Sequence, residues 1–325
     1  MAAQRAALVV DLGGTTAKVA LVSQTRRIVQ SDVIPTGRHS RPQTLIPKLA
    51  KALQALKQGA RRRGFSVKGI AIGVPGLVDA KRGMVHYLVN MAGWREVPLR
   101  RLIERSLKLP VLVDNDVNLM AWGEYRWGVG RGTQSLLCLM LGTGVGGGII
   151  IDGRLLRGRK FSSGEIGHIP VVENGLRCTC GGRGCLERYV GNQALIQAAR
   201  ARLRKYPTGQ LKRLLRANQG KMTPVVIEDA ARAGDRWARQ LWRQAGGRIG
   251  FALVRAVNLI HPDRVVIGGG ISKAGNLLFP SIRATVRSRA MKGKSGPAHV
   301  AIVQTQWGQE AGLMGAAAAV LSPES

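Results

Sequence analysis

Glycine-rich turns between short apolar runs constrain the fold of this chain more than any other feature. One such unit lies between residues 7 and 22 and a second between residues 136 and 151. Each reads as a strand, a glycine turn and a return strand, so both predict a β-hairpin of the same design. A third glycine cluster, residues 268–270, ends the apolar run 265–267 and leads into a predicted helix. The chain is expected to carry one hairpin at the start of each half.

Turns of this kind suit phosphate binding, because backbone N–H groups bind phosphate oxygens and glycine lets the backbone approach closely. The first turn also offers the carboxylate of Asp11, a group that can hold Mg²⁺ directly or through water. No segment has the Walker A pattern. A G-x-G-x-x-G match at residues 142–147 precedes a strand, whereas the dinucleotide fold requires a helix there. Each turn alone is explained by a tight hairpin; the three together favour a nucleotide site.

Strands alternate with helices between the two hairpins, which predicts an α/β protein. A helix is expected at about residues 41–63 and strands at 69–74 and 111–113. After Cys185 the chain is predicted to be mostly helical, over residues 192–205, 210–218, about 224–259 and, in an Ala-rich segment, 308–321.

Two acidic residues follow the predicted strand 111–113, in the sequence Asp114-Asn115-Asp116. In an α/β sheet the carboxyl end of a strand faces the ligand crevice. Transfer of a phosphoryl group to an alcohol uses a base near the hydroxyl, worth about 10²–10⁴ in rate. Asp116 is a candidate for that base and Asn115 for a hydrogen bond to a neighbouring hydroxyl. The alternative is that Asp116 caps a helix starting at Val117.

Three cysteines and one histidine form a candidate metal site. Three thiolates and an imidazole complete a closed tetrahedral set, which is typical of structural zinc, whereas catalytic zinc keeps an open position. Glu165 and Glu187 flank this segment and are candidates to accept hydrogen bonds from sugar hydroxyls, or else surface charges. A fourth cysteine, Cys138, is predicted to be a buried thiol. The candidate zinc ligands are His168, Cys178, Cys180 and Cys185.

The net charge of +32 is unusually positive. One interpretation is binding to nucleic acid, since basic surfaces neutralise phosphates. The basic residues are scattered, however, and no zinc-finger spacing or helix-turn-helix pattern accompanies them. The charge therefore favours an Arg-rich surface over specific nucleic-acid binding. No signal peptide or membrane-spanning run is recognised, so the expected location is the cytoplasm.

Taken together, the motifs resemble those of the ROK family of sugar kinases and repressors along nearly the whole chain. Residues 11–15 and 141–148 are similar to its two phosphate motifs, 73–79 and 90–94 to its sugar-side loops, and 266–270 to its adenosine-side motif. The most specific marks are Glu165-x-Gly-His168 and the Cys-x-Cys-Gly-x-x-Gly-Cys-x-Glu pattern ending at Glu187.

The resemblance implies a two-lobed α/β fold of the actin/hexokinase-like (ribonuclease H-like) ATPase class, with the active-site cleft between the lobes. A small N-terminal lobe is expected over residues 1–118, with the helix at about 308–325 packing back on it. A larger lobe with the zinc loop and the nucleotide-side motifs is expected over residues 119–307. Family members are commonly homodimers or homotetramers.

The resemblance also implies a role for each motif residue. Asp116 would act as general base toward the 6-hydroxyl of a sugar, His168 would serve both zinc and sugar, zinc would be structural, and Mg²⁺ would arrive with ATP. The implied sugar-binding residues are Gly76, Asn90, Asn115, Asp116, Glu165, His168 and Glu187. The implied nucleotide-binding residues are Asp11, Gly13, Gly14, Thr15, Thr16, Lys18, Gly142, Thr143, Gly144, Gly268, Gly269 and Gly270.

Several functions fit this resemblance. ATP-dependent phosphorylation of glucose is favoured, because glucose is the commonest substrate of chains with the whole pattern. N-Acetylmannosamine, N-acetylglucosamine and fructose are alternative substrates, since their kinases share the same motifs. A sugar-responsive DNA-binding repressor is disfavoured, because family repressors carry a DNA-binding segment ahead of the first phosphate motif and here ten residues precede Asp11.

Overall fold

The computed structural model describes residues 3–37, 39–88, 91–293, 296–297 and 300–324. The chain divides into two compact units. Unit 1 comprises residues 1–138, 148–164 and 305–325, and unit 2 comprises residues 139–147 and 165–304. These boundaries differ from the predicted division of the chain between residues 118 and 119. The division into functional lobes stays a prediction.

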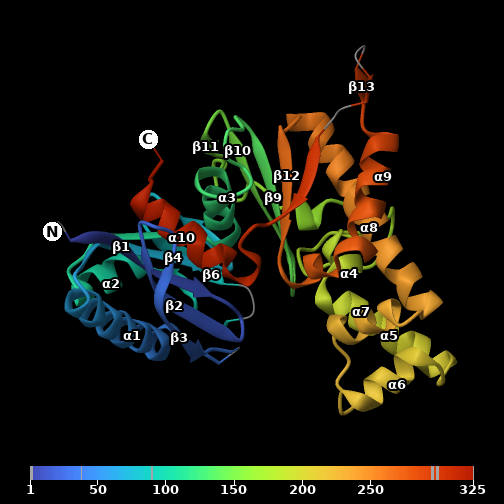
Figure 1. The fold of residues 1–325 in the computed structure, drawn as a ribbon, viewed down its shortest axis with the longest axis horizontal. Helices are drawn as coiled ribbons and strands as arrows, with labels where there is room; N and C mark the ends of the chain where they lie inside the picture. The colour runs from blue at the N-terminus through green and yellow to red at the C-terminus, as the bar shows by residue number, and fades with distance from the viewer. Residues whose placement is uncertain (1–2, 38, 89–90, 294–295, 298–299, 325) are drawn as a thin grey trace. The chain divides into compact units, whose positions relative to one another are not determined.

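A five-stranded mixed sheet forms the centre of unit 1 (Figure 1). Its strand order is β3-β2-β1-β4-β8, in which β1 pairs antiparallel with β2 and parallel with β4. The predicted first hairpin is therefore present, and its turn is shorter than expected because β1 runs through Leu12. The strands are β1 (Gln4–Leu12), β2 (Thr16–Ser23), β3 (Ile28–Pro35), β4 (Phe65–Val74) and β8 (Val111–Asn115).

Helices cover both faces of this sheet, which explains why β1 is apolar without interruption from Ala6 to Val10. Alternate β1 residues such as Leu8 and Val10 belong to a core shared with Leu45, Leu49 and Leu53 of α1 (Pro42–Arg62). Side chains alternate along a strand, so the remaining β1 residues face the other side. There α10 (Ala311–Leu321) contacts β1 and β4. The predicted Ala-rich C-terminal helix thus packs on the N-terminal sheet.

Two glycines bring α10 into close contact with α3 (Asp116–Arg126). A Cβ atom added to Gly123 would lie 2.6 Å from the Cα of Gly315, and one added to Gly315 would lie 2.0 Å from the carbonyl oxygen of Leu119. Each distance is far below a normal carbon contact, so the backbones themselves touch. The position of α3, and of the residues at its start, is thereby tied to α10.

A second five-stranded sheet has the order β11-β10-β9-β12-β15. It contains the second predicted hairpin, β9 and β10, but β10 begins at Val145, so Gly146–Gly148 belong to the strand and not to the turn. Gly148 has a packing reason: a Cβ atom there would lie 2.8 Å from the Ala121 side chain of α3. The strands are β9 (Leu136–Leu141), β10 (Val145–Ile151), β11 (Arg154–Leu155), β12 (Arg264–Gly268) and β15 (Ala301–Gln304).

Two small sheets were not predicted from the sequence. One has the order β5-β6-β7 and the other pairs β13 with β14. Their strands are β5 (Gly76–Asp79), β6 (Met84–Leu88), β7 (Arg95–Val97), β13 (Lys292–Gly293) and β14 (Gly296–Pro297).

The predicted helical segment 224–259 is two helices. Gly234 has φ +98, a conformation that a helix cannot continue through, and the side chain of Asp235 caps the next helix at the amide of Ala238. The remaining helices are α2 (Leu99–Leu107), η1 (Ile166–His168), α4 (Glu187–Val190), α5 (Asn192–Lys205), α6 (Gln210–Ala217), α7 (Pro224–Arg232), α8 (Arg236–Ile260), η2 (Gly270–Leu277), α9 (Phe279–Arg289) and η3 (Gly308–Glu310).

Candidate active site and metal centre

Asp116, the candidate base, is the first residue of α3 and is half-buried. The helix cap is Asn115, whose Oδ1 accepts hydrogen bonds from the amides of Val117 at 2.9 Å and Asn118 at 3.3 Å. The idea that Asp116 caps a helix starting at Val117 is therefore wrong. The partial positive charge at a helix N-terminus favours a negatively charged side chain at this position.

Asn115 also links Asp116 to Gly76, another predicted sugar-binding residue. Its Nδ2 donates to the carbonyl oxygen of Gly76 at 3.2 Å. Gly76 begins β5, and a Cβ atom there would lie 2.2 Å from the carbonyl oxygen of Tyr87 on β6. Only glycine fits this contact, so unit 1 brings Gly76, Asn115 and Asp116 together. The predicted residue Asn90 lies outside the described residues.

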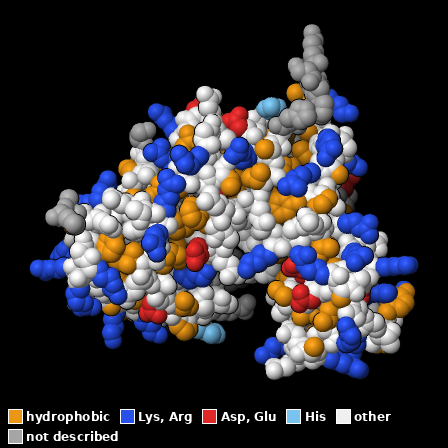
Figure 2. Space-filling model, viewed as in Figure 1, with side chains coloured by type: hydrophobic (Ala, Val, Ile, Leu, Met, Phe, Trp, Pro, Cys, Tyr) orange, Lys and Arg blue, Asp and Glu red, His pale blue; other side chains and the backbone are white. Residues whose placement is uncertain are grey.

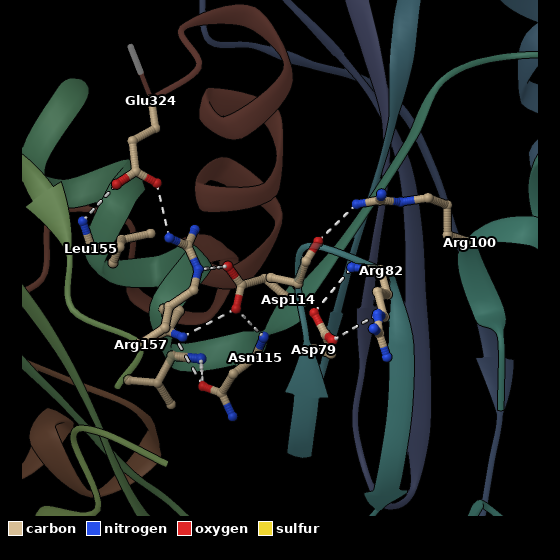
Figure 3. Close-up of polar contacts among 11 residues, drawn as sticks. Asp79, Arg82, Arg100, Asp114, Asn115, Leu155, Arg157 and Glu324 are labelled. Carbon is tan, nitrogen blue, oxygen red and sulfur yellow. Dashed lines mark hydrogen bonds and ion pairs between the residues drawn. The ribbon is translucent and has the colours of Figure 1, made fainter. Parts of the chain in front are cut away.

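An ion pair holds the residue just before this group. The buried carboxylate of Asp114 accepts a hydrogen bond from Nε of Arg157 at 2.9 Å, and a guanidinium NH₂ nitrogen of Arg157 donates to Glu324 at 2.9 Å (Figure 3). The three residues come from β8, from the segment after β11 and from the segment after α10. Neither Arg157 nor Glu324 is among the site residues predicted from the sequence.

The first glycine turn holds the predicted phosphate-side residues of unit 1. Its backbone is closed by a hydrogen bond from the amide of Gly13 to the carbonyl of Thr16 at 2.8 Å, and Gly14 and Thr15 are exposed. Asp11 and Lys18 are register partners on β1 and β2. Burial raises the pKa of Asp11, and the ammonium group of Lys18 opposes this shift. The turn thus offers exposed amides beside one carboxylate.

The second and third glycine clusters lie together in unit 2. The second turn is closed by a hydrogen bond from the amide of Gly142 to the carbonyl of Gly144 at 2.9 Å. Gly269 has φ +87, and a Cβ atom there would lie 2.2 Å from the carbonyl oxygen of Leu141. The chain after β12 therefore passes directly against the end of β9. Two of the three predicted phosphate segments, 142–144 and 268–270, are neighbours.

Glu187 connects the second turn with the predicted sugar-binding residues. Its Oε2 accepts a hydrogen bond from the amide of Val145 at 2.9 Å. Burial raises the pKa of Glu165, an effect that the nearby His168 opposes and the nearby Glu187 strengthens. Oε2 of Glu165 lies 3.8 Å from Nε2 of His168. Unit 2 thus places the two predicted carboxylates and the histidine at one site, next to the turn.

The four predicted metal ligands also converge. The ligand atoms of His168, Cys178, Cys180 and Cys185 all lie within 4.8 Å of one another, a spacing that fits a single tetrahedral ion. Nδ1 of His168 faces the Cys178 sulfur at 3.5 Å, whereas Nε2 faces Glu165. One imidazole can therefore serve a metal with one nitrogen and a hydroxyl-bearing ligand with the other. This donor set of three sulfurs and one nitrogen fits zinc.

Backbone turns shape the metal loop. The amide of Cys178 donates to the carbonyl of Gly182 at 2.8 Å. Gly184 has φ +72, and a Cβ atom there would lie 1.8 Å from the carbonyl oxygen of Val172. Gly184 is thus required for the loop to fold back against Val172.

The positive charge is spread over the face of the molecule that Figure 2 shows. Figure 2 shows Lys and Arg side chains across the visible face, with few acidic side chains among them. This distribution agrees with the scattered pattern in the sequence. Within the part of the chain that the structure describes, no helix is both long enough and apolar enough to cross a membrane.

Comparison with known proteins gives a consistent result. Residues 7–322 match the model of the ROK family. A glucokinase from Halalkalibacterium halodurans is 36% identical over 307 residues, which cover 94% of this chain and 92% of that protein.

Solved structures agree with the sequence comparison. A ROK family glucokinase from Streptomyces griseus, crystallised with glucose and AMPPNP, matches with a TM-score of 0.84 and 35% identity, covering 97% of this chain and 99% of that one. A transcriptional regulator described as a homologue of the Escherichia coli MLC protein matches with a TM-score of 0.87 and 26% identity, covering 98% of this chain and 78% of that one. These likenesses confirm the predicted actin- and hexokinase-like α/β class.

Proposed function

This chain belongs to the ROK family, and on that premise we propose that it is an ATP-dependent kinase that phosphorylates glucose to glucose 6-phosphate. One observation carries the proposal: over 97% of its length the chain matches a glucokinase crystallised with glucose and AMPPNP. The side chains present support it, because the two units carry a candidate base, carboxylates for sugar hydroxyls and glycine turns for phosphate.

In the proposed mechanism Asp116 accepts the proton of the sugar 6-hydroxyl while the hydroxyl oxygen attacks the γ-phosphorus of ATP. The bond from that phosphorus to the bridging oxygen breaks, and ADP leaves with the electron pair. Little further chemistry is needed, because phosphoryl transfer depends mainly on positioning and on charge stabilisation. The cap at Asn115 and the hydrogen bond to Gly76 hold Asp116 in place for this step.

The remaining residues are assigned to binding. Glu165, His168 and Glu187 would form hydrogen bonds with the other sugar hydroxyls. From unit 1 the sugar would be contacted by Gly76, Asn115 and the sequence-predicted Asn90. The amides of the glycine turns would bind phosphate oxygens. Mg²⁺, bound with ATP, would neutralise phosphate charge, and Asp11 is the carboxylate proposed to hold it.

We propose that zinc binds to His168, Cys178, Cys180 and Cys185 and has a structural role. A closed set of four protein ligands leaves no position for a reacting water. The ion would fix the loop from which His168 and Glu187 reach the sugar. A homodimer or homotetramer and a cytoplasmic location are proposed from the family resemblance.

A coupled assay of ADP formation over a panel of sugars tests the function. Glucose should give the highest kcat/KM, and N-acetylmannosamine, N-acetylglucosamine, fructose and mannose should give lower values. A higher kcat/KM for one of the other sugars would reassign the substrate within the same reaction. An absence of sugar-dependent ADP formation, together with salt-sensitive retention on DNA, would instead favour the repressor function.

A further inference from the structure

The segment that carries the proposed base is anchored through Asp114. This carboxylate is 1% exposed, and both of its oxygens have partners. Oδ1 accepts hydrogen bonds from the amide of Asn115 at 2.7 Å and from Nδ2 of Asn118 at 3.1 Å. Oδ2 accepts one from Nε of Arg157 at 2.9 Å (Figure 3). Asp114 therefore binds the start of α3 through Oδ1 and binds Arg157 through Oδ2.

Arg157 is held in turn by Glu324. A guanidinium NH₂ nitrogen of Arg157 donates to Oε2 of Glu324 at 2.9 Å, and Oε1 of Glu324 accepts a hydrogen bond from the amide of Leu155 at 2.9 Å. The side chains of Arg157 and Glu324 are 24% and 29% exposed. Because these charges are mostly shielded from water, their attraction is weakened less than that of a surface pair.

We infer that Arg157 is a positioning residue for the phosphoryl transfer and that Glu324 keeps it in place. This inference rests on the proposed function, in which Asp116 is the base. Arg157 neutralises the buried Asp114, and Asp114 fixes the amide of Asn115 and the side chain of Asn118 on either side of Asp116. The role of Arg157 is thus exerted through Asp114.

A shift at this point would affect catalysis more than binding. Loss of Arg157 leaves a buried carboxylate without its counter-charge, and such a group draws in water or a proton and rearranges its neighbours. Asp116 lies two residues beyond Asp114, at the first turn of α3. A displacement of about 1 Å in a reacting group can lower the rate by about 10²-fold. Glu165, His168 and Glu187 belong to unit 2, so these three proposed sugar contacts do not depend on Asp114, whereas that of Asn115 does.

The test compares Arg157→Met, Arg157→Lys, Glu324→Gln and the double variant Arg157→Met/Glu324→Gln in the full chain. The values of kcat and of KM for glucose and ATP are measured well below the Tm of each variant. Arg232→Met is the matched control, because Arg232 also pairs with a carboxylate, that of Glu228 at 2.8 Å, on α7. Wild-type protein is assayed alongside, and its glucose-dependent ADP formation tests the proposed function separately.

Arg157→Met should lower kcat by on the order of 10- to 100-fold and leave KM for glucose within about twofold of wild type. Arg157→Lys should recover part of this loss, because an ammonium group can still pair with Asp114 but lacks the paired donors of a guanidinium. Glu324→Gln should lower kcat by a smaller factor. The double variant should match Arg157→Met, since Glu324 acts on Asp114 through Arg157.

Wild-type kcat in Arg157→Met would overturn the inference, as would a loss seen only in KM or additive losses in the double variant. If Arg157→Met does not fold, Glu324→Gln decides the question, because it leaves the counter-charge of Asp114 in place. In that case an unchanged kcat in Glu324→Gln overturns the inference, and a lowered kcat with unchanged KM for glucose supports it.

Discussion

The carboxylate of Glu187 accepts a hydrogen bond from the backbone amide of Val145, with its Oε2 2.9 Å from the amide nitrogen. Val145 directly follows the turn 142–144, which is proposed to bind phosphate, and Glu187 is proposed to bind sugar. One side chain therefore supports two binding functions within unit 2. A change at Glu187 should disturb both.

Glu187→Ala should raise KM for glucose and KM for ATP by roughly tenfold each, because a hydrogen bond to a charged group is worth about 1.5–3 kcal/mol. Steady-state kinetics with each substrate varied in turn measures both constants. Glu173→Ala removes an exposed carboxylate from the same unit and is the matched control. A rise confined to KM for glucose would show that the turn does not depend on Glu187.

Asp116→Asn should lower kcat by about 10²–10⁴, because the amide cannot accept the hydroxyl proton. The Asn side chain has the same shape, so the fold and the Kd for glucose should change little. Kinetics and equilibrium binding of labelled glucose give the two values, with Asp32→Asn, a change at an exposed residue of β3, as the control. Activity close to wild type would remove Asp116 from the role of base.

One zinc ion per chain is expected from elemental analysis of the purified protein. Cys180→Ser should lose most of this zinc and lower Tm by roughly 5 °C or more, because metal-binding energy contributes to folding. Cys138→Ser, which changes a buried thiol outside the four-residue cluster, should keep its zinc. Protein that is free of zinc yet as stable as before would contradict the structural role.

Glu124 should make stability depend on pH. Burial raises the pKa of Glu124 above its ordinary value of 4.5, although hydrogen bonds from Thr305 and from backbone amides oppose the shift. The folded protein then binds this proton more tightly than the unfolded chain. The contribution of the carboxyl group to the free energy of unfolding is therefore present below pH 4.5 and lost as the pH rises through the raised pKa.

The variant Glu124→Gln has no titratable group at this position, so its free energy of unfolding is compared with that of wild type. It should be less stable than wild type by about 1–3 kcal/mol at low pH, because its amide NH₂ would face the amide of Val129. This difference should shrink as the pH rises toward neutrality, as measured by urea unfolding at several pH values. A difference that grows with pH would show that the folded protein favours the charged form.

Local patterns made much of the fold predictable from the sequence. Both hairpins, the helix at 42–62 and the convergence of His168 with the three cysteines follow from short apolar runs and from glycine spacing. The end of the second turn was misplaced, because Gly146–Gly148 belong to β10 and Gly148 packs against α3. The break at Gly234 was also missed, because apolar periodicity continues on both sides of it.

Contacts between distant parts of the chain could not be predicted. Arg157 and Asp114 are 43 residues apart, and Arg157 and Glu324 are 167 residues apart. Arg157 is one of several basic residues between 154 and 160, and no local pattern accompanies Glu324. Their pairing depends on how β8, β11 and α10 are arranged, which no local pattern encodes. The same holds for the link between Glu187 and Val145, where the sequence showed both partners but not their contact.

The backbone contact between Gly123 of α3 and Gly315 of α10 limits the substitutions that this protein can tolerate. Because two backbones touch there, a single added methyl group at either position would push α3 aside and carry Asp116 with it. Substitutions remote from any ligand could thus silence the enzyme while leaving every functional side chain intact. A related protein in which either glycine is replaced is expected to have lost kinase activity, even if it keeps all the motif residues.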